Sequence, residues 1–277
     1  NCIAKLFMNY KHIILTRFNL PFDLQSNIHI QREWLTERMR LFEQYCLPSI
    51  VQQTNRQFTW VILASDQTPR DMQNMLLSLT AIYPFIHILF CAYTNDLNAL
   101  YQQVGEKYVQ GYDYLLSTRI DSDDMLSANF CQALQSSVQN SLEEGIYTFP
   151  DGIQWFERNH LTHGVRYDKN HFLSFFESAS HVKTCLGFDH TKVSTQQLIR
   201  VCGIAMWCEI VHGNNICNAY TPAYRYSAPI ISEGSYPISF PLSNTLRQYL
   251  FLMREHIRFR YHQLGRGLRK LLRHHNA

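Results

Sequence analysis

The chain lacks the features that would place it among membrane-spanning, zinc-binding or disulfide-linked proteins. Its longest apolar runs, such as WVILA at residues 60–64, are far too short to cross a bilayer. It has eight cysteines, but no C-x-x-C pair and no zinc-type spacing. Buried free thiols in a reducing cytoplasm explain such scattered cysteines better than a disulfide framework does. Residues 1–5 lack the charged-then-apolar order of a secretory signal.

Charged residues are sparse, at 17% of the 277 residues, whereas hydrophobic residues make up 46%. This composition is typical of a globular protein with a substantial core. No repeat or low-complexity linker interrupts residues 1–244, which favours one domain over two. Residues 245–277 contain eight Lys/Arg and a single acidic residue, Glu255. The rest of the chain has 17 basic and 21 acidic side chains. We therefore treat residues 245–277 as a separate basic tail.

Short apolar runs alternate with helical patterns over the first 120 residues. The apolar runs, which predict strands, cover residues 12–16, 58–64, 86–90 and 112–118. Apolar residues recur every three or four positions in the intervening segments, which predicts helices over about residues 35–50, 70–82 and 96–108. Pro48 falls inside the first of these and predicts a kink or a new helix there. Continuous apolar strands that alternate with helices predict an α/β fold whose parallel sheet is covered on both faces.

Beyond residue 124 the pattern is less regular. Residues 130–138 predict a helix and residues 145–149 a strand. The segment from there to residue 244 mixes short strands with loops rich in aromatic residues. We expect it to form a less regular second half of the same domain.

The most informative stretch is the acidic cluster of Asp121, Asp123 and Asp124, which closes the fourth apolar run. Carboxylates crowded in this way repel one another unless a cation, a solvated turn or a hydrogen-bond donor compensates them. An isolated Asp-x-Asp is most often a solvated turn. Here three strand-helix units precede it, and ligands of parallel sheets bind beyond the carboxyl ends of the strands. Asn19 and Asp66 follow the first two strands, at the same expected edge.

Two segments resemble the signatures of a known family. Residues 118–124 (TRIDSDD) and 207–215 (WCEIVHGNN) resemble those of the bacterial putative rhamnosyltransferase family, and residues 40–60 resemble a stretch of bacterial GT-A glycosyltransferases. The resemblance runs from about residue 12 to residue 218 and leaves the basic tail outside. It implies a GT-A (Rossmann-like), mainly parallel sheet flanked by helices over residues 1–244. It also implies an inverting, hexosyltransferase-type enzyme that uses a nucleotide-diphosphate sugar.

The resemblance further implies a metal site. Asp121 and Asp123 match the Asp-x-Asp positions, the first facing the ribose or the metal and the second ligating it. The implied cofactor is a divalent cation, Mn²⁺ or Mg²⁺, that bridges the diphosphate. His212 stands where a histidine of many GT-A enzymes completes the metal or diphosphate site; the alternative is an ordinary, hydrogen-bonded loop histidine.

The implied donor site uses strand ends. Thr16 and Arg17 at the first strand, and Asp66 at the second, fall where these enzymes hold the nucleotide base and ribose, next to Asp121. Around Asp66 only one acid remains of the usual acidic pair, a departure from the family pattern. Arg119 either adds a cationic donor to this site or pairs with a neighbouring carboxylate.

The catalytic base is the least determined role. It would deprotonate the acceptor hydroxyl while the diphosphate leaves. Asp189 and Glu209 are the two candidates. Each has the competing interpretation of an ordinary surface or helix-start carboxylate.

The basic tail has a helical pattern. Apolar residues recur every three or four positions and arginines flank them, although two glycines interrupt the second half. The apolar positions are Leu246, Leu250, Met253, Ile257, Tyr261, Leu264, Leu268 and Leu271. The pattern predicts an amphipathic helix that lies on an anionic membrane, docks on the body or forms a dimer seam. Nucleic acid is not expected, because no recognition module accompanies the charge.

These observations predict a metal-dependent glycosyltransferase of bacterial surface polysaccharide synthesis. The expected acceptor is a glycan or a lipid-linked glycan, and the expected location is the cytoplasm or the inner face of the plasma membrane. The rival hypothesis is a catalytically degenerate GT-A domain that acts as a binding or scaffold module. A phosphohydrolase with Asp121 as nucleophile is disfavoured, since no partner lysine or threonine motif follows.

Overall fold

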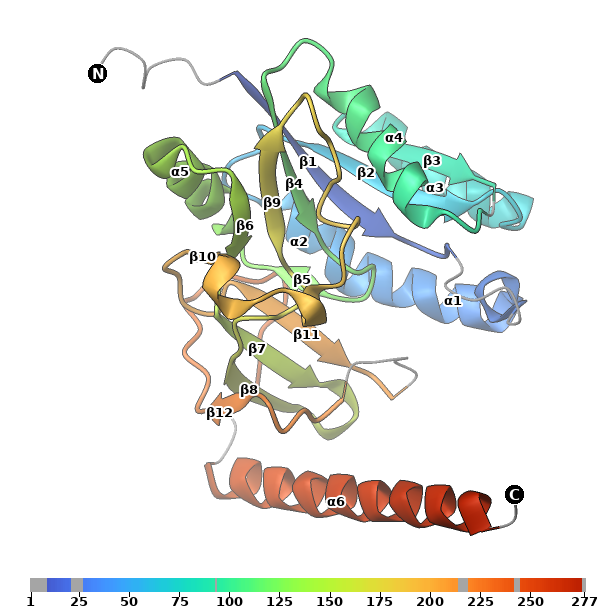
Figure 1. Cartoon of the computed structure of the whole chain (residues 1–277), viewed down its shortest axis with the longest axis vertical. Coiled ribbons are helices and arrows are strands. Elements are labelled where there is room, and N and C mark those ends of the chain that lie inside the picture. Colours follow the sequence, from blue (N-terminus) through green and yellow to red (C-terminus); the bar gives the residue numbers. More distant parts are fainter. Residues whose placement is uncertain (1–8, 21–26, 93, 214–218, 242–244, 276–277) are drawn as a thin grey trace.

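The computed structural model describes residues 9–20, 27–92, 94–213, 219–241 and 245–275, and in the last range the side chains of 245–261 and 264. The strands form a seven-stranded main sheet, in the order β10-β6-β9-β4-β1-β2-β3, and a five-stranded second sheet, in the order β12-β8-β7-β11-β5 (Figure 1). The main-sheet strands are β1 (Tyr10–Arg17), β2 (Thr59–Ser65), β3 (Ile86–Cys91), β4 (Tyr114–Arg119), β6 (Gly145–Thr148), β9 (Ser174–Ser178) and β10 (Leu198–Arg200). The second-sheet strands are β5 (Met125–Leu126), β7 (Asp151–Phe156), β8 (Leu161–Arg166), β11 (Trp207–Val211) and β12 (Arg225–Ser227).

The four strands expected from the apolar runs are parallel neighbours in the main sheet, in the order β4-β1-β2-β3. β1 pairs in parallel with β2 on one side and β4 on the other, and β2 pairs in parallel with β3. Every residue of β2 is buried, because helices cover both faces and so permit an uninterrupted apolar run. The parallel register brings the carboxyl ends of β1, β2 and β4 to one edge. β9 then adds antiparallel to β4 and extends the sheet beyond the sequence prediction.

Each face of the main sheet has its own layer of helices. One face packs against α1, a following π-helical turn, α2, α3 and α5, and the other packs against α4. The bounds are α1 (Arg32–Leu41), η3 (Phe42–Cys46), α2 (Leu47–Val51), α3 (Arg70–Ile82), α4 (Leu97–Val109) and α5 (Phe130–Ser141). Strand alternation explains the division, since Ile14 faces the first layer and Ile13 the second. At Pro48, where the sequence predicted a kink or a new helix, the backbone stays helical: the π-helical turn ends at Cys46, and Pro48 lies in the first turn of α2.

The second sheet lies against the carboxyl edge of the main sheet and carries half of the site. β7 and β11 are parallel neighbours, with Cys208 opposite Ile153, although 55 residues separate them in the chain. β5, directly after the acidic cluster, pairs antiparallel with β11. The acidic cluster therefore lies in the connection between the two sheets.

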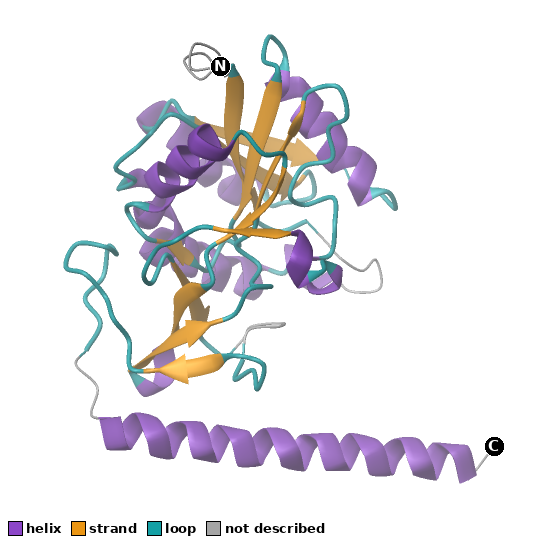
Figure 2. Cartoon of the chain, turned by 60° about the vertical axis from the view of Figure 1, so that its left-hand side comes forward, coloured by secondary structure: helices purple, strands orange, loops and turns teal. Residues whose placement is uncertain are grey.

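The basic tail forms one long helix, α6 (Thr245–His275), as the apolar spacing predicts. In both views α6 lies along the outer side of the second sheet, remote from the main sheet (Figures 1 and 2). No helix within the described ranges is both long and apolar enough to span a bilayer. The side chains of the last tail arginines (Arg266, Arg269 and Arg273), Lys270, Leu268 and Leu271 lie outside the described residues, as do Asn214 and Asn215 of the second signature.

Candidate active site at the acidic turn

The acidic turn is held between strands of both sheets. It begins where β4 ends, and the backbone N–H of Asp124 donates to the carbonyl of Asp121 at 3.2 Å, which closes the turn. β5 follows immediately and fixes the far end of the turn against β11. Asp123 and Asp124 are buried, at 5% and 0% exposure, whereas the side chain of Asp121 is 29% exposed. Of the three carboxylates, Asp121 is the one that a ligand can reach from solvent.

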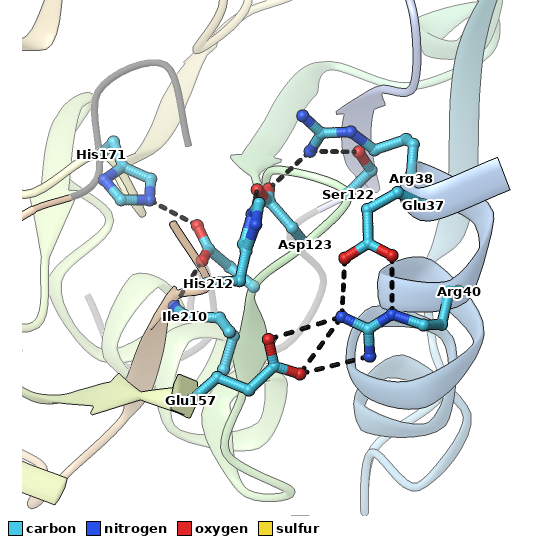
Figure 3. A network of polar contacts seen from close by, with 10 residues as sticks. Glu37, Arg38, Arg40, Ser122, Asp123, Glu157, His171, Ile210 and His212 are labelled. Atoms are coloured by element: carbon cyan, nitrogen blue, oxygen red, sulfur yellow. Dashed lines mark hydrogen bonds and ion pairs between the residues drawn. The ribbon is translucent and has the colours of Figure 1, made fainter. Parts of the chain in front are cut away.

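Asp123 is bonded on both oxygens (Figure 3). Its Oδ1 lies 2.9 Å from Nη1 of Arg38, on α1, and its Oδ2 lies 3.1 Å from Nε2 of His212, just after β11. Burial alone would raise the pKa of Asp123, but the Arg38 charge and the His212 hydrogen bond hold that pKa below its ordinary value. The guanidinium of Arg38 is itself stacked over the ring of Trp34, 4.7 Å from its centroid. Asp123 is thus a fixed anion within a packed cluster.

Asp124 has partners other than those of Asp123. Its Oδ1 accepts the backbone N–H of Ile210 at 2.9 Å, and its Oδ2 lies 2.8 Å from Nε2 of His171 (Figure 3). Burial and the neighbouring charges of Asp123 and Asp121 raise the pKa of Asp124 well above its ordinary value. Asp124 therefore holds a proton more readily than an isolated aspartate does.

Asp121 is oriented by a fork of hydrogen bonds from the preceding strand. Nε and Nη2 of Arg119 donate to its two carboxylate oxygens at 3.2 and 3.0 Å. Burial acts to raise the pKa of Asp121, but the charges of Arg119, His171 and Arg17 outweigh it and hold that pKa well below the usual range. Asp121 is consequently ionised at neutral pH. Of the two roles considered for Arg119, the structure forms the pairing with Asp121.

The donor set of this turn fits a divalent cation. Asp121, Asp124 and His171 each offer one ligand atom, and these atoms all lie within 4.8 Å of one another. Two carboxylates and an imidazole form a donor set that suits Mn²⁺, and the carboxylate oxygens alone suit Mg²⁺. Burial is the main cause of the raised pKa of Asp124, and a cation would offset the second cause, the charges of Asp123 and Asp121. The structure thus groups Asp121 with Asp124 and His171, whereas the sequence grouped it with Asp123 and His212.

The remaining residues expected at the donor site differ in accessibility. Thr16 is fully buried and its hydroxyl accepts the indole N–H of Trp60 at 2.9 Å. Arg17 is half-buried and close enough to Asp121 to lower its pKa. Asp66 has an exposed side chain at the end of β2. Asn19, at the same edge, ties β1 to β2, since its amide oxygen accepts the Ser65 N–H at 3.0 Å.

The two candidate bases lie in contrasting environments. Glu209, on β11, is 3% exposed, and Nε2 of Gln154 donates to it at 3.0 Å. Burial, opposed by His171 but reinforced by Asp124, raises the pKa of Glu209 to about 7. Asp189 is exposed and caps the short helix at His190–Lys192, where it accepts the N–H of Thr191 at 2.9 Å.

Arg38 and His171 are the two residues of this cluster that sequence reasoning missed. Arg38 reaches the turn from a helix 84 residues earlier, and His171 reaches it from a loop 47 residues later. The loop is fixed by buried Asn170, whose amide donates to the carbonyl of Phe149 at 3.0 Å and accepts the N–H of Phe172. No local motif marks either residue. In the sequence His171 only ends a polar run, residues 168–171, just before β9, and such a run does not indicate a site.

The chain has a mainly parallel sheet with an acidic turn at its carboxyl edge, and its sequence matches a glycosyltransferase family. Its family model, described as "Putative rhamnosyl transferase", matches residues 11–224. The chain belongs to this family. No curated protein sequence matches it.

Two bacterial proteins are among the solved structures that match part of the chain. One is a "putative nucleotide-diphospho-sugar transferase" from Desulfovibrio desulfuricans G20, 8% identical, with 73% of this chain and 80% of that chain covered and a TM-score of 0.34. Another is a "Putative Glucose-1-Phosphate Thymidylyltransferase" from Bacillus anthracis in complex with a sucrose, 16% identical, with 55% and 57% covered and a TM-score of 0.27.

Proposed function

We propose that the protein is a metal-dependent glycosyltransferase that moves a sugar, rhamnose in the first instance, from a nucleotide-diphosphate donor to a glycan or lipid-linked acceptor. The observation that carries the proposal is the convergence of Asp121, Asp124 and His171 at the carboxyl edge of the sheet of a family member. The process would be bacterial surface polysaccharide synthesis at the cytoplasmic face of the plasma membrane. There the predicted tail, residues 245–277, would meet anionic lipid.

The proposed reaction is a single displacement with inversion. The acceptor oxygen bonds to the anomeric carbon as the bond from that carbon to the diphosphate oxygen breaks, and the acceptor proton passes to a carboxylate. A cation held by Asp121, Asp124 and His171, with Asp123 and His212 beside them, would supply positive charge to the departing diphosphate. Arg119 orients Asp121 by its two hydrogen bonds.

Of the two proposed bases, the local environments favour Glu209. A general base works best when its pKa lies near the operating pH, and burial brings the pKa of Glu209 to about 7. The carboxylate of Asp189 is already bonded to Thr191, by both the backbone N–H and the hydroxyl. Those bonds lower its pKa and weaken it as a proton acceptor.

The function is tested by nucleotide-sugar hydrolysis without acceptor, over a panel of UDP-, GDP- and dTDP-sugars. We expect one donor to be hydrolysed with Mn²⁺ or Mg²⁺ and the rate to fall at least about a hundredfold with a chelator, because the developing diphosphate charge loses its counter-charge. Re-addition of metal is the control. If no donor is hydrolysed under any metal, the scaffold hypothesis replaces the enzyme.

The two histidines distinguish the two proposed ligand sets. We expect His171→Ala to lower the affinity for Mn²⁺ by at least about tenfold, because its donor atom already lies with those of Asp121 and Asp124. The matched variant His212→Ala is expected to have a smaller effect, since the converging donor atoms are those of Asp121, Asp124 and His171. Calorimetric titration with Mn²⁺ measures both affinities. The opposite order would establish the set of Asp121, Asp123 and His212.

A further inference from the structure

The apolar side chains of α6 are concentrated on its outer side. Seven of the fifteen exposed large hydrophobic side chains in the described residues fall between positions 246 and 264. They are Leu246, Tyr249, Leu250, Met253, Ile257, Tyr261 and Leu264, each at least 45% exposed. We call these seven residues the outer stripe. An exposed apolar surface of this kind marks an interaction site.

The main contacts of α6 with the body lie on another side than the outer stripe, of which Met253 and Ile257 line a pocket beside Tyr220. Phe251 is 8% exposed, packs edge-on against Phe156 at 4.7 Å between ring centroids, and stacks on His163 at 5.8 Å. Gln248, 6% exposed, donates to the carbonyl of Thr162 at 2.7 Å. At 3.6 residues per turn, positions 248 and 251 lie on the side of the helix opposite positions 246, 250, 253 and 257. Docking on the body therefore buries the inner side of the helix, whereas the outer stripe stays exposed and available to another partner.

Basic residues border the outer stripe. Arg254 and Arg258 have side chains 57% and 61% exposed, and both pair with Glu255, the one acid of residues 245–277. Eight Lys/Arg in this segment leave a large positive excess after that pairing. Tyr249 and Tyr261 lie at opposite margins of the outer stripe, where an amphipathic ring suits a boundary between water and lipid.

We propose that the outer stripe lies flat on an anionic lipid leaflet, with its apolar side chains at the headgroup boundary and the arginines at headgroup level. Charge decides between the two candidate occupants. A second copy of the chain would bring two basic tails together, whereas an anionic leaflet neutralises them. The inference rests on the proposed function only in that a lipid-linked acceptor would lie on the same surface. The docked inner side holds β8, the strand of the second sheet that contains Thr162, next to that leaflet.

Co-sedimentation of the full chain with vesicles tests this surface, using phosphatidylcholine with and without phosphatidylglycerol. We expect binding only to the anionic vesicles. Ile257→Glu is expected to weaken it at least about tenfold, the effect of losing one buried isoleucine. Ile204→Glu is the matched control: Ile204 lies on the body and is 64% exposed, as is Ile257, and the substitution adds the same charge. It is expected to leave vesicle binding unchanged.

Three results would overturn the proposal: no binding of the wild-type chain to anionic vesicles, equal binding of Ile257→Glu and wild type, or equal loss in both variants. A concentration-dependent dimer without lipid that Ile257→Glu disrupts, and no vesicle binding, would assign the outer stripe to a second copy of the chain. Calorimetry with Mn²⁺ and a nucleoside diphosphate, run on the same samples, separates the two hypotheses. Vesicle binding without nucleotide binding would contradict only the proposed function. Nucleotide binding without vesicle binding would contradict only the proposal that the outer stripe binds a membrane.

Discussion

Asp121→Asn is expected to lower the affinity of the protein for Mn²⁺ by more than about a hundredfold and to abolish metal-dependent binding of a nucleoside diphosphate. Asp121 is the most exposed carboxylate of the turn, and neighbouring positive charges keep it ionised. Asparagine keeps the shape but removes the charge and one of the convergent oxygens. Calorimetric titration with Mn²⁺, followed by nucleotide, measures both effects.

A matched control separates the loss of a ligand from the loss of an ion pair. Asp71→Asn also removes a carboxylate that is paired with an arginine, since Asp71 lies 2.8 Å from Arg32 on the surface. An exposed ion pair contributes little to stability, so this variant should fold and bind Mn²⁺ as the wild type does. Undiminished Mn²⁺ affinity in Asp121→Asn, with the fold intact by circular dichroism, would remove Asp121 from the metal site.

The part of the main sheet formed by β1 to β4 was predictable, because strands that are buried on both faces have a recognisable local sequence pattern. Each of β1 to β4 appears in the sequence as a continuous apolar run, and each helix between them as a three-or-four spacing. The strands of the second sheet have no such sequence pattern. Its strands have two to six residues, and its parallel pair, β7 and β11, joins segments that are distant in the chain. Such pairing is decided by tertiary packing and not by local pattern.

The residues of the candidate site likewise fall into a group that the sequence could predict and a group that it could not. The three carboxylates of the turn are contiguous, so the sequence could predict both their cluster and its place at a strand end. Arg38 and His171 bond to that cluster from other elements, and no spacing rule connects them with it. The sequence also predicted an amphipathic tail but not which side of it docks. That side is set by Phe251 and Gln248, which stand outside the apolar pattern of the helix.

Gly152→Ala is expected to lower the free energy of unfolding by about 3 kcal/mol or more, the upper range for overpacking a core. Gly152, on β7, faces the indole of Trp207 so closely that a Cβ would lie 2.2 Å from the ring. The ring has no room to move: Trp207 is 0% exposed, stacks on Phe172 at 4.9 Å, and donates its indole N–H to the carbonyl of Phe149. Urea denaturation measures the loss.

The appropriate comparison for this variant is Gly111→Ala. Gly111 has φ of 84° and nothing within 4 Å of an added Cβ, so the change adds backbone strain without a clash and should cost only about 1–2 kcal/mol. Trp207 opens β11, the strand that carries Glu209 and leads to His212. A clash at Trp207 should therefore displace this side of the site as well, and we expect Gly152→Ala to weaken Mn²⁺-dependent nucleotide binding while Gly111→Ala leaves it unchanged. Equal stability of the two variants would mean that the indole can move, and that its contact with Gly152 does not hold β11 in place.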